Sequence, residues 1–123
     1  MQLTPETRPT QHIIIGYGPT EIRLRDRVLT ASSIVTGGLI QPWAVTSAQA
    51  LAAEDLDAVI ALDVDVVLLA TGARQQWPPP AVLAHAARRG IGLEVMDVGA
   101  ACRTYNVLLA EQRRVALAAI LPG

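Results

Sequence analysis

The sequence contains no phenylalanine, no lysine and only four aromatic residues, although half of its 123 residues are hydrophobic. A core made without phenylalanine must be filled by valine, isoleucine, leucine and alanine, which suits strands and helices packed in layers. All ten basic residues are arginine. Codon bias toward GC-rich triplets explains this preference, and selection for bidentate pairing with carboxylate or phosphate is the alternative explanation.

Other absences exclude whole classes of protein. One cysteine, Cys102, allows neither an internal disulfide nor a site with several cysteine ligands for a metal. A net charge of −1 argues against a nucleic-acid partner. No apolar run reaches the roughly 18 to 20 residues of a membrane-spanning helix, and residues 1–10 lack the features of a signal peptide. We therefore expect a soluble cytoplasmic protein with no cofactor and no membrane span.

The first third of the chain alternates apolar and polar residues with a period of two, which is typical of strands. In one such segment, Ile22 and Leu24 fall on one face, with Glu21 and Arg23 on the other. Short strands this close together predict an antiparallel meander. Its four strands are expected at residues 11–17, 20–24, 28–36 and 39–45.

After residue 46 the pattern changes to helices separated by buried strands. A first helix is expected to begin between Ser47 and Glu54 and to continue to about residue 62. The five apolar residues Val66–Ala70 predict a strand buried on both faces. The elements expected after it are a helix from Pro80 or Ala81 closed by Gly90, a parallel strand at 91–96, a helix at 98–109 and a strand at 114–121.

These elements predict a single domain over residues 1–123, with residues 1–10 as a loosely ordered arm. The fold class is α/β (α+β), with three layers arranged β/β/α. Its mixed central sheet combines the antiparallel N-terminal meander with a parallel β-α-β unit, and helices are expected over one face.

Polar residues follow the two predicted parallel strands, where ligands of such sheets usually bind. Thr71 offers a hydroxyl, and Gly72 permits close approach of a backbone amide. Asp97 follows the second strand. A single glycine falls short of a phosphate-binding fingerprint, so a plain turn at Thr71–Gly72 is the competing interpretation.

Trp77 precedes three consecutive prolines. Proline fixes its own φ and holds the preceding residue extended, so this segment is expected to be rigid. Trp77, Pro78 and Pro79 could therefore form a preformed surface for a protein partner. The competing interpretation places the Trp77 ring over the following helix.

A polar cluster interrupts the helix predicted at 98–109. Arg103 could pair with Asp97 or Glu111, or could bind an anionic ligand. Tyr105 is expected to support the core, which has few aromatic rings. Tyr105 and Asn106 could also tie this helix by hydrogen bonds to the loop after residue 70.

The remaining polar residues do not form a recognisable catalytic or metal site. Cys102 is expected to be a buried, inert thiol, because His12 and His85 lie in other segments. No zinc-ligand spacing, Ser-His-Asp order or glycine-rich phosphate loop can be assembled. Two acidic pairs, Glu54/Asp55 and Asp63/Asp65, are typical of helix caps or solvated faces.

Two runs carry a resemblance to a known family: LLATGARQQWPPP and RRGIGLEVMDVGAACRTYNVLLAEQRRVALAAILP. They resemble the signature of domain-of-unknown-function family 498, which contains the mitochondrial respiratory complex I assembly factor 3. The resemblance is most specific between Leu68 and Leu121. The chain departs from it at Val98, where the family more often has threonine, and at Trp77, where phenylalanine is common.

The resemblance implies a three-layer β/β/α fold with a mixed sheet and no established enzymatic activity. It also implies binding to other proteins, as in the assembly of a membrane complex. We therefore favour a non-enzymatic protein-interaction module, with Trp77 and the prolines as its docking surface. The first alternative is a small-molecule binder or unrecognised enzyme with one pocket joining Thr71, Gly72, Arg103 and Asn106. The second is a symmetric homodimer.

Overall fold

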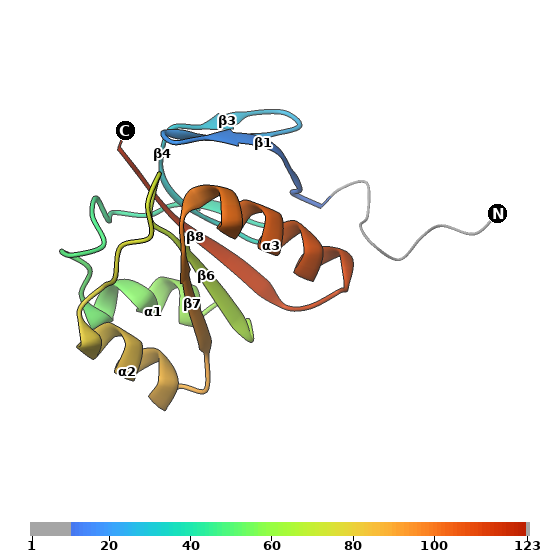
Figure 1. The fold of residues 1–123 in the computed structure, drawn as a ribbon. Coiled ribbons are helices and arrows are strands. Elements are labelled where there is room, and N and C mark those ends of the chain that lie inside the picture. Colours follow the sequence, from blue (N-terminus) through green and yellow to red (C-terminus); the bar gives the residue numbers. More distant parts are fainter. Residues whose placement is uncertain (1–10, 123) are drawn as a thin grey trace.

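A computed structural model describes residues 11–122, so the arm predicted at residues 1–10 lies outside the described part. Two sheets form the domain (Figure 1). The three-stranded antiparallel sheet contains β1 (Ile14–Gly18), β2 (Glu21–Leu24) and β3 (Val28–Leu29). The mixed five-stranded sheet, in the order β5-β4-β8-β6-β7, contains β4 (Ala31–Val35), β5 (Ile40–Pro42), β6 (Val66–Ala70), β7 (Gly92–Met96) and β8 (Val115–Pro122).

The helical elements are the 3-10 helix η1 (Ala53–Leu56), α1 (Asp57–Ile60), α2 (Pro80–Arg88) and α3 (Val98–Ala110). The predicted elements after residue 65 are confirmed, including the parallel pairing of β6 with β7. The mixed α/β class, with an antiparallel N-terminal part and a parallel β-α-β unit, is also confirmed.

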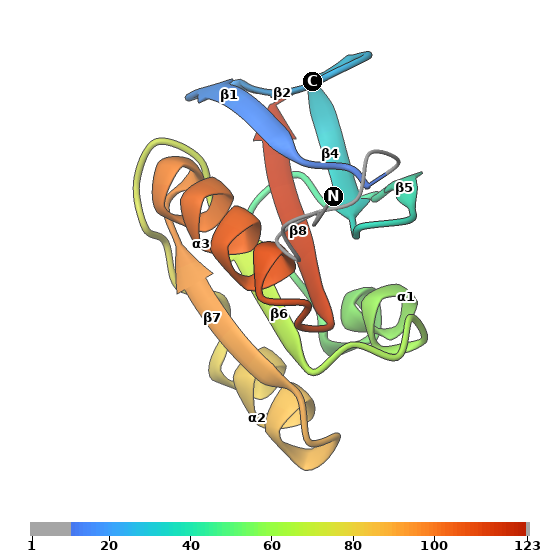
Figure 2. The same ribbon diagram turned by 90° about the vertical axis from the view of Figure 1, so that its right-hand side faces the viewer.

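Strand β8 occupies the centre of the large sheet (Figure 2). It pairs antiparallel with β4 and parallel with β6, and every residue in it except the last is buried. Alternate side chains enter two separate core clusters. Leu117 and Leu121 face one cluster, and Ala118 and Ile120 face the other. Burial on both faces explains why this segment is apolar without alternation.

Helices cover both faces of this sheet, so the expectation of helices over one face is wrong. Helix α3 packs in the cluster that includes β1, β2 and β3, whereas η1, α1 and α2 pack in the other. The strand order explains the difference. The chain moves outward from β6 to β7 and then returns past β6 to β8. Two crossovers of the same hand, made in opposite directions, place their helices on opposite faces.

The expected N-terminal meander is divided between the two sheets. Strand β2 buries Ile22 and Leu24 on one face, as predicted, and leaves Arg23 exposed. Strand β4 differs because its last four residues are all buried. A strand that is buried on both faces needs packed layers on both sides. Strand β4 has them in the large sheet, where Val35 packs in one core cluster and Ile34 in the other.

The first predicted helix begins at Ala53, within the expected range from Ser47 to Glu54, and consists of the short η1 and α1, which end at Ile60. The Ser47 hydroxyl accepts a hydrogen bond from the Ala50 amide and closes a separate turn. The Asp55 carboxylate accepts from the Ala52 amide at 2.8 Å and caps the helix start. The cap role predicted for the Glu54/Asp55 pair is therefore confirmed for Asp55.

The positive φ of Gly90, the glycine after α2, can be tested by substitution. Gly90 has φ of +72°, and an added Cβ would meet nothing within 4 Å. We expect Gly90→Ala to lower the free energy of unfolding by about 1 kcal/mol, because only glycine adopts this conformation freely. Gly38→Ala is the matched control, since its Cβ is equally unobstructed and its φ is not positive. If chemical denaturation gave the same loss of unfolding free energy for both variants, the positive φ at Gly90 would be contradicted.

Candidate functional site

The loop between β6 and α2 is held by the buried hydroxyl of Thr71. This hydroxyl donates to the Arg74 carbonyl oxygen at 2.6 Å and accepts from the Gln76 amide at 3.0 Å. Only 7% of Thr71 is exposed. These contacts occupy its hydroxyl, so Thr71 organises the turn.

Gly72 turns the chain at the C-terminal end of β6. Its φ of +90° lies in the region that favours glycine. The Gly72 carbonyl oxygen accepts a hydrogen bond of 2.7 Å from the Val98 amide, at the first residue of α3. This contact joins the loop after β6 to the start of α3.

The segment around Trp77 is fixed at several points while the indole remains exposed. The Gln75 side chain donates to the Val95 carbonyl oxygen at 2.8 Å, and the Gln76 side chain accepts from Gln49. Pro78 is buried and Pro79 is half-buried. Trp77 itself is 60% exposed. The backbone on either side of Trp77 is therefore anchored to the domain.

Tyr105 and Asn106 tie α3 to the N-terminal part of the chain. The Tyr105 hydroxyl donates to the His12 carbonyl oxygen at 2.6 Å. The Asn106 amide donates to the Ile14 carbonyl oxygen at 2.7 Å and accepts from the Ile14 amide at 3.0 Å. The suggested bonds to the loop after residue 70 are therefore absent from the described contacts of these two side chains. Tyr105 is fully buried, as its predicted core role requires.

Arg103 pairs with neither Asp97 nor Glu111 among the described residues. Its guanidinium donates to the Tyr17 hydroxyl and lies 5.9 Å from the centre of the Tyr17 ring. Asp97 instead caps α3 by accepting from the Ala100 amide at 2.9 Å. Tyr17 of β1, which the sequence did not indicate as a site residue, therefore holds Arg103 in place.

A surface hollow of about 430 Å³ lies at this point. It is found beside the ends of β6 and β7 that precede the Gly72 turn and Asp97. Its wall includes Tyr17, Pro19, Ala73, Asp97, Gly99 and Arg103. Of the four residues expected in one pocket, only Arg103 contributes; Thr71, Gly72 and Asn106 do not line it. No local pattern in the sequence indicated Tyr17 or Pro19, since the docking of β1 on α3 brings them here.

The groups that could support catalysis are dispersed. Burial raises the pKa of the Cys102 thiol to about 12, although the nearby charge of Arg103 acts in the opposite direction. His85 Nε2 lies 3.3 Å from Asp57 Oδ1, on helices far from Cys102 in the chain. Residues 11–122 contain no group of three or more His, Cys, Asp or Glu side chains that could hold a metal ion.

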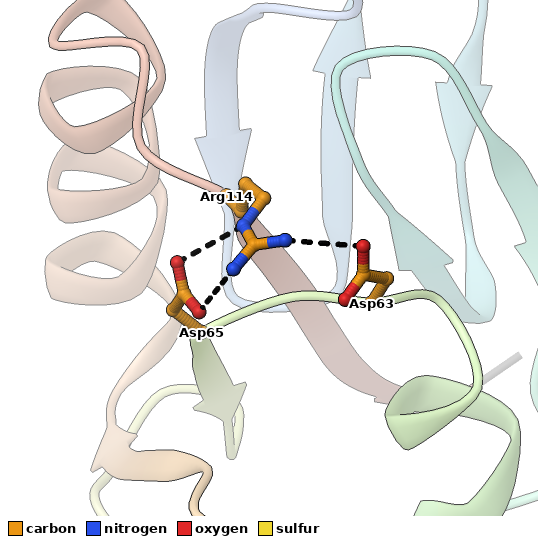
Figure 3. Close-up of polar contacts among 3 residues, drawn as sticks. All are labelled: Asp63, Asp65 and Arg114. Carbon is orange, nitrogen blue, oxygen red and sulfur yellow. Dashed lines mark hydrogen bonds and ion pairs between the residues drawn. The ribbon is translucent and has the colours of Figure 1, made fainter.

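Asp63 and Asp65 form a clamp on Arg114 (Figure 3). Arg114 donates to both oxygens of Asp65, at 2.8 and 3.1 Å, and to Asp63 at 3.0 Å. The hydrogen bonds and negative charges, those of Asp65 first, raise the pKa of Arg114. Because Asp65 precedes β6 and Arg114 precedes β8, the clamp joins the beginnings of two parallel strands. Its exposure to water limits its effect on stability.

Comparison with known proteins defines the family. The family described as protein of unknown function (DUF498/DUF598) matches residues 14–120, and the chain belongs to it. Similar proteins include an NADH dehydrogenase [ubiquinone] 1 alpha subcomplex assembly factor 3 from Danio rerio, which is 32% identical over 89% of this chain. An uncharacterized protein from Rhodobacter capsulatus is 34% identical over 89% of this chain and 83% of its own length.

Solved structures share the fold. An NMR structure of a Xanthomonas campestris protein has 41% sequence identity and a TM-score of 0.84, covering 99% of this chain and 91% of that one. A crystal structure from Bordetella parapertussis has 30% identity and a TM-score of 0.84, covering 91% and 97%. This chain spans 64% of the Danio rerio assembly factor and 53% of the one from Xenopus tropicalis. In the described chain, no helix has the length and apolar character needed to cross a membrane.

The contacts of Asn106 predict a structural effect of its replacement. Asn106→Ala should lower the free energy of unfolding by about 1–3 kcal/mol, because two half-buried backbone groups of Ile14 lose their partner. Asn106→Asp should also destabilise the fold, since a carboxylate accepts from the Ile14 amide but cannot donate to its carbonyl oxygen. Urea denaturation measures both effects. An Asp variant as stable as the original chain would contradict this assignment.

The buried acidic protons predict alkaline sensitivity. Burial raises the pKa of Cys102 from 9.0 to about 12 and raises the pKa of Tyr105 as well. The folded state keeps these protons where the unfolded chain releases them, so their stabilising effect is complete below the unfolded pKa values and declines above them. The free energy of unfolding should fall above about pH 9, by up to about 1.4 kcal/mol per pH unit for each group.

Cys102→Ala separates the two contributions. Denaturation curves between pH 8 and roughly 11 should show a shallower decline in this variant, whatever its baseline stability, because only Tyr105 remains. An identical pH slope in both chains would contradict a role for the buried thiol.

Proposed function

We propose that the protein is a non-enzymatic interaction module that binds a protein partner through the surface formed by Trp77, Pro78 and Pro79. The single observation that carries the proposal is a 60% exposed indole on an anchored backbone. A partner that covers this indole removes a large apolar area from water, which favours association. We place this activity in the cytoplasm, as the single cysteine suggests.

The physical properties of this loop suit recognition. Tryptophan buries a large apolar area and is frequent among the residues that dominate binding energy. The anchored loop loses little conformational freedom on binding, because the buried Pro78 and the contacts of Gln75 and Gln76 already fix it. A larger share of the free energy gained by covering Trp77 therefore contributes to binding affinity.

The names of relatives support a protein partner. Family members from Danio rerio and Xenopus tropicalis are named as assembly factors of an NADH dehydrogenase subcomplex. An assembly factor acts on other protein chains. The present chain corresponds to only part of those relatives, so the identity of its own partner is a separate question.

Substitution of Trp77 tests the proposal. Affinity capture of the tagged chain from its own cells in gentle detergent should recover specific partners, and Trp77→Ala should lose them. Trp77→Phe should retain most capture, because an aromatic ring remains on the same rigid support. Val107→Ala is the matched control, since Val107 is similarly exposed (56%) but lies on α3. Removing a hot-spot ring typically weakens binding by about 2 kcal/mol or more.

Capture of the same proteins by the original chain and by Trp77→Ala would contradict the Trp77 surface. Sedimentation of the same two chains at micromolar concentration shows whether the partner is a second copy of this chain. A homodimer that Trp77→Ala dissociates would support the symmetric-dimer form of the proposal.

A second candidate function follows from the hollow beside Arg103. Its volume of about 430 Å³ lies within the roughly 300–1,000 Å³ of known ligand sites. Its position beyond the carboxyl ends of two parallel strands is where such sheets bind ligands. We propose that a small molecule binds there. Gly72 would contribute by shaping the turn that places Ala73 in the wall, rather than by touching the ligand.

A further inference from the structure

The hollow combines apolar walls with an oriented cation. Tyr17, Pro19 and Ala73 supply apolar surface, and Asp97 and Arg103 supply the charges. Arg23, Arg27 and Arg114 each lie at ion-pair distance from a carboxylate, and Arg114 binds two aspartates. Within residues 11–122, Arg103 has no carboxylate at ion-pair distance.

The contact with Tyr17 orients Arg103 without neutralising it. The Tyr17 hydroxyl oxygen accepts from the guanidinium, and the ring lies 5.9 Å away. A guanidinium has five donors, and this contact uses one of them. The O–H donor of Tyr17 has no acceptor among the described residues. Two kinds of donor, N–H and O–H, therefore lie side by side at one end of the hollow.

Gly99 makes this arrangement possible. A Cβ at Gly99 would lie 2.9 Å from Tyr17 Cε1 and 3.1 Å from an Arg103 terminal nitrogen. The ring and the guanidinium therefore rest against the backbone of α3, where any side chain would displace them. A substitution here perturbs both donors without removing either one.

Asp97 restricts the charge of an acceptable ligand. One of its oxygens caps α3, so the helix start is already satisfied by the protein. Its negative charge remains in the wall, where it repels an anion with two charges more strongly than an anion with one. The hollow therefore favours one negative charge near Arg103 and Tyr17, joined to an apolar body.

We propose that the hollow binds a small monocarboxylate with an apolar body. The carboxylate accepts hydrogen bonds from Arg103 and the Tyr17 hydroxyl, and the apolar body packs on Tyr17, Pro19 and Ala73. This inference rests on the second candidate function, a small-molecule site at the hollow. It is independent of the Trp77 surface.

Titration with three matched compounds tests the inference, with backbone amide NMR shifts as the readout. Phenylacetate, phenylacetamide and 2-phenylethylammonium share a ring but differ in charge. Phenylacetate should shift the amides of Tyr17, Ala73 and Gly99 in a saturable way, at about millimolar concentration. The amide should bind roughly tenfold more weakly, because charge-assisted hydrogen bonds are the stronger kind. The ammonium compound and inorganic phosphate should bind more weakly still.

Variants locate the binding group. Arg103→Gln should weaken phenylacetate binding about tenfold, whereas Arg113→Gln removes one positive charge elsewhere and should leave it unchanged. Gly99→Ala should weaken binding by displacing Tyr17 and Arg103. Gly38→Ala is its control, because a Cβ there meets nothing within 4 Å and Gly38 does not line the hollow. Unchanged amide spectra outside the hollow verify that each variant is folded.

The outcomes separate the two levels of the proposal. Equal binding of phenylacetamide or the ammonium compound, or unchanged binding in Arg103→Gln, would overturn the carboxylate inference and leave a small-molecule site in place. Absence of shifts at the hollow with all the compounds, up to roughly 10 mM, would overturn the inference and the site together.

Discussion

Burial of β8 on both faces is the constraint on which the rest of the domain depends. A strand in this position needs a hydrogen-bonded neighbour on each side and a packed layer on each face. Strands β4 and β6 provide the neighbours, and the Arg114 clamp joins the beginnings of β6 and β8. Helices η1, α1 and α2 form one layer; α3 and the small sheet form the other.

The candidate sites arise where this arrangement leaves surfaces uncovered. Asn106 binds the backbone of Ile14, which fixes β1 alongside α3. The same docking brings Tyr17 to Arg103 and creates one wall of the hollow. In the loop between β6 and α2, the Thr71 hydroxyl holds the backbone that presents Trp77. Both surfaces therefore depend on side chains that bind backbone groups rather than ligands.

The sequence predicts the fold well where its signals are local. The apolar run of β6, the proline at the start of α2 and Gly90 after it all act within a few residues, and the structure confirms each of them. For the first helix the sequence gives only a range for the start, Ser47 to Glu54, because two competing caps have similar local patterns and the structure uses Asp55. The placement of α3 on the opposite face depends on strand order, which no local pattern encodes.

Site residues were harder to predict from the sequence, because several of them are brought together only by tertiary packing. Trp77 and Arg103 are conspicuous as residue types, so the sequence could identify them. Tyr17 lies 86 positions from Arg103, and only the docking of β1 makes them neighbours. Thr71, with its hydroxyl next to a flexible glycine, resembles a ligand-binding residue in sequence. Its role in holding the loop emerges only from the contacts with Arg74 and Gln76.

The central claim, that the anchored Trp77 surface contacts another protein, is tested most directly by photo-crosslinking inside the cell. A photoreactive phenylalanine derivative would replace Trp77 in the full chain, and the same derivative would replace Val107 in a control. Our account predicts a discrete adduct with another polypeptide from position 77 and none of the same mass from position 107. No adduct from position 77, or the same adduct from both positions, would contradict the account.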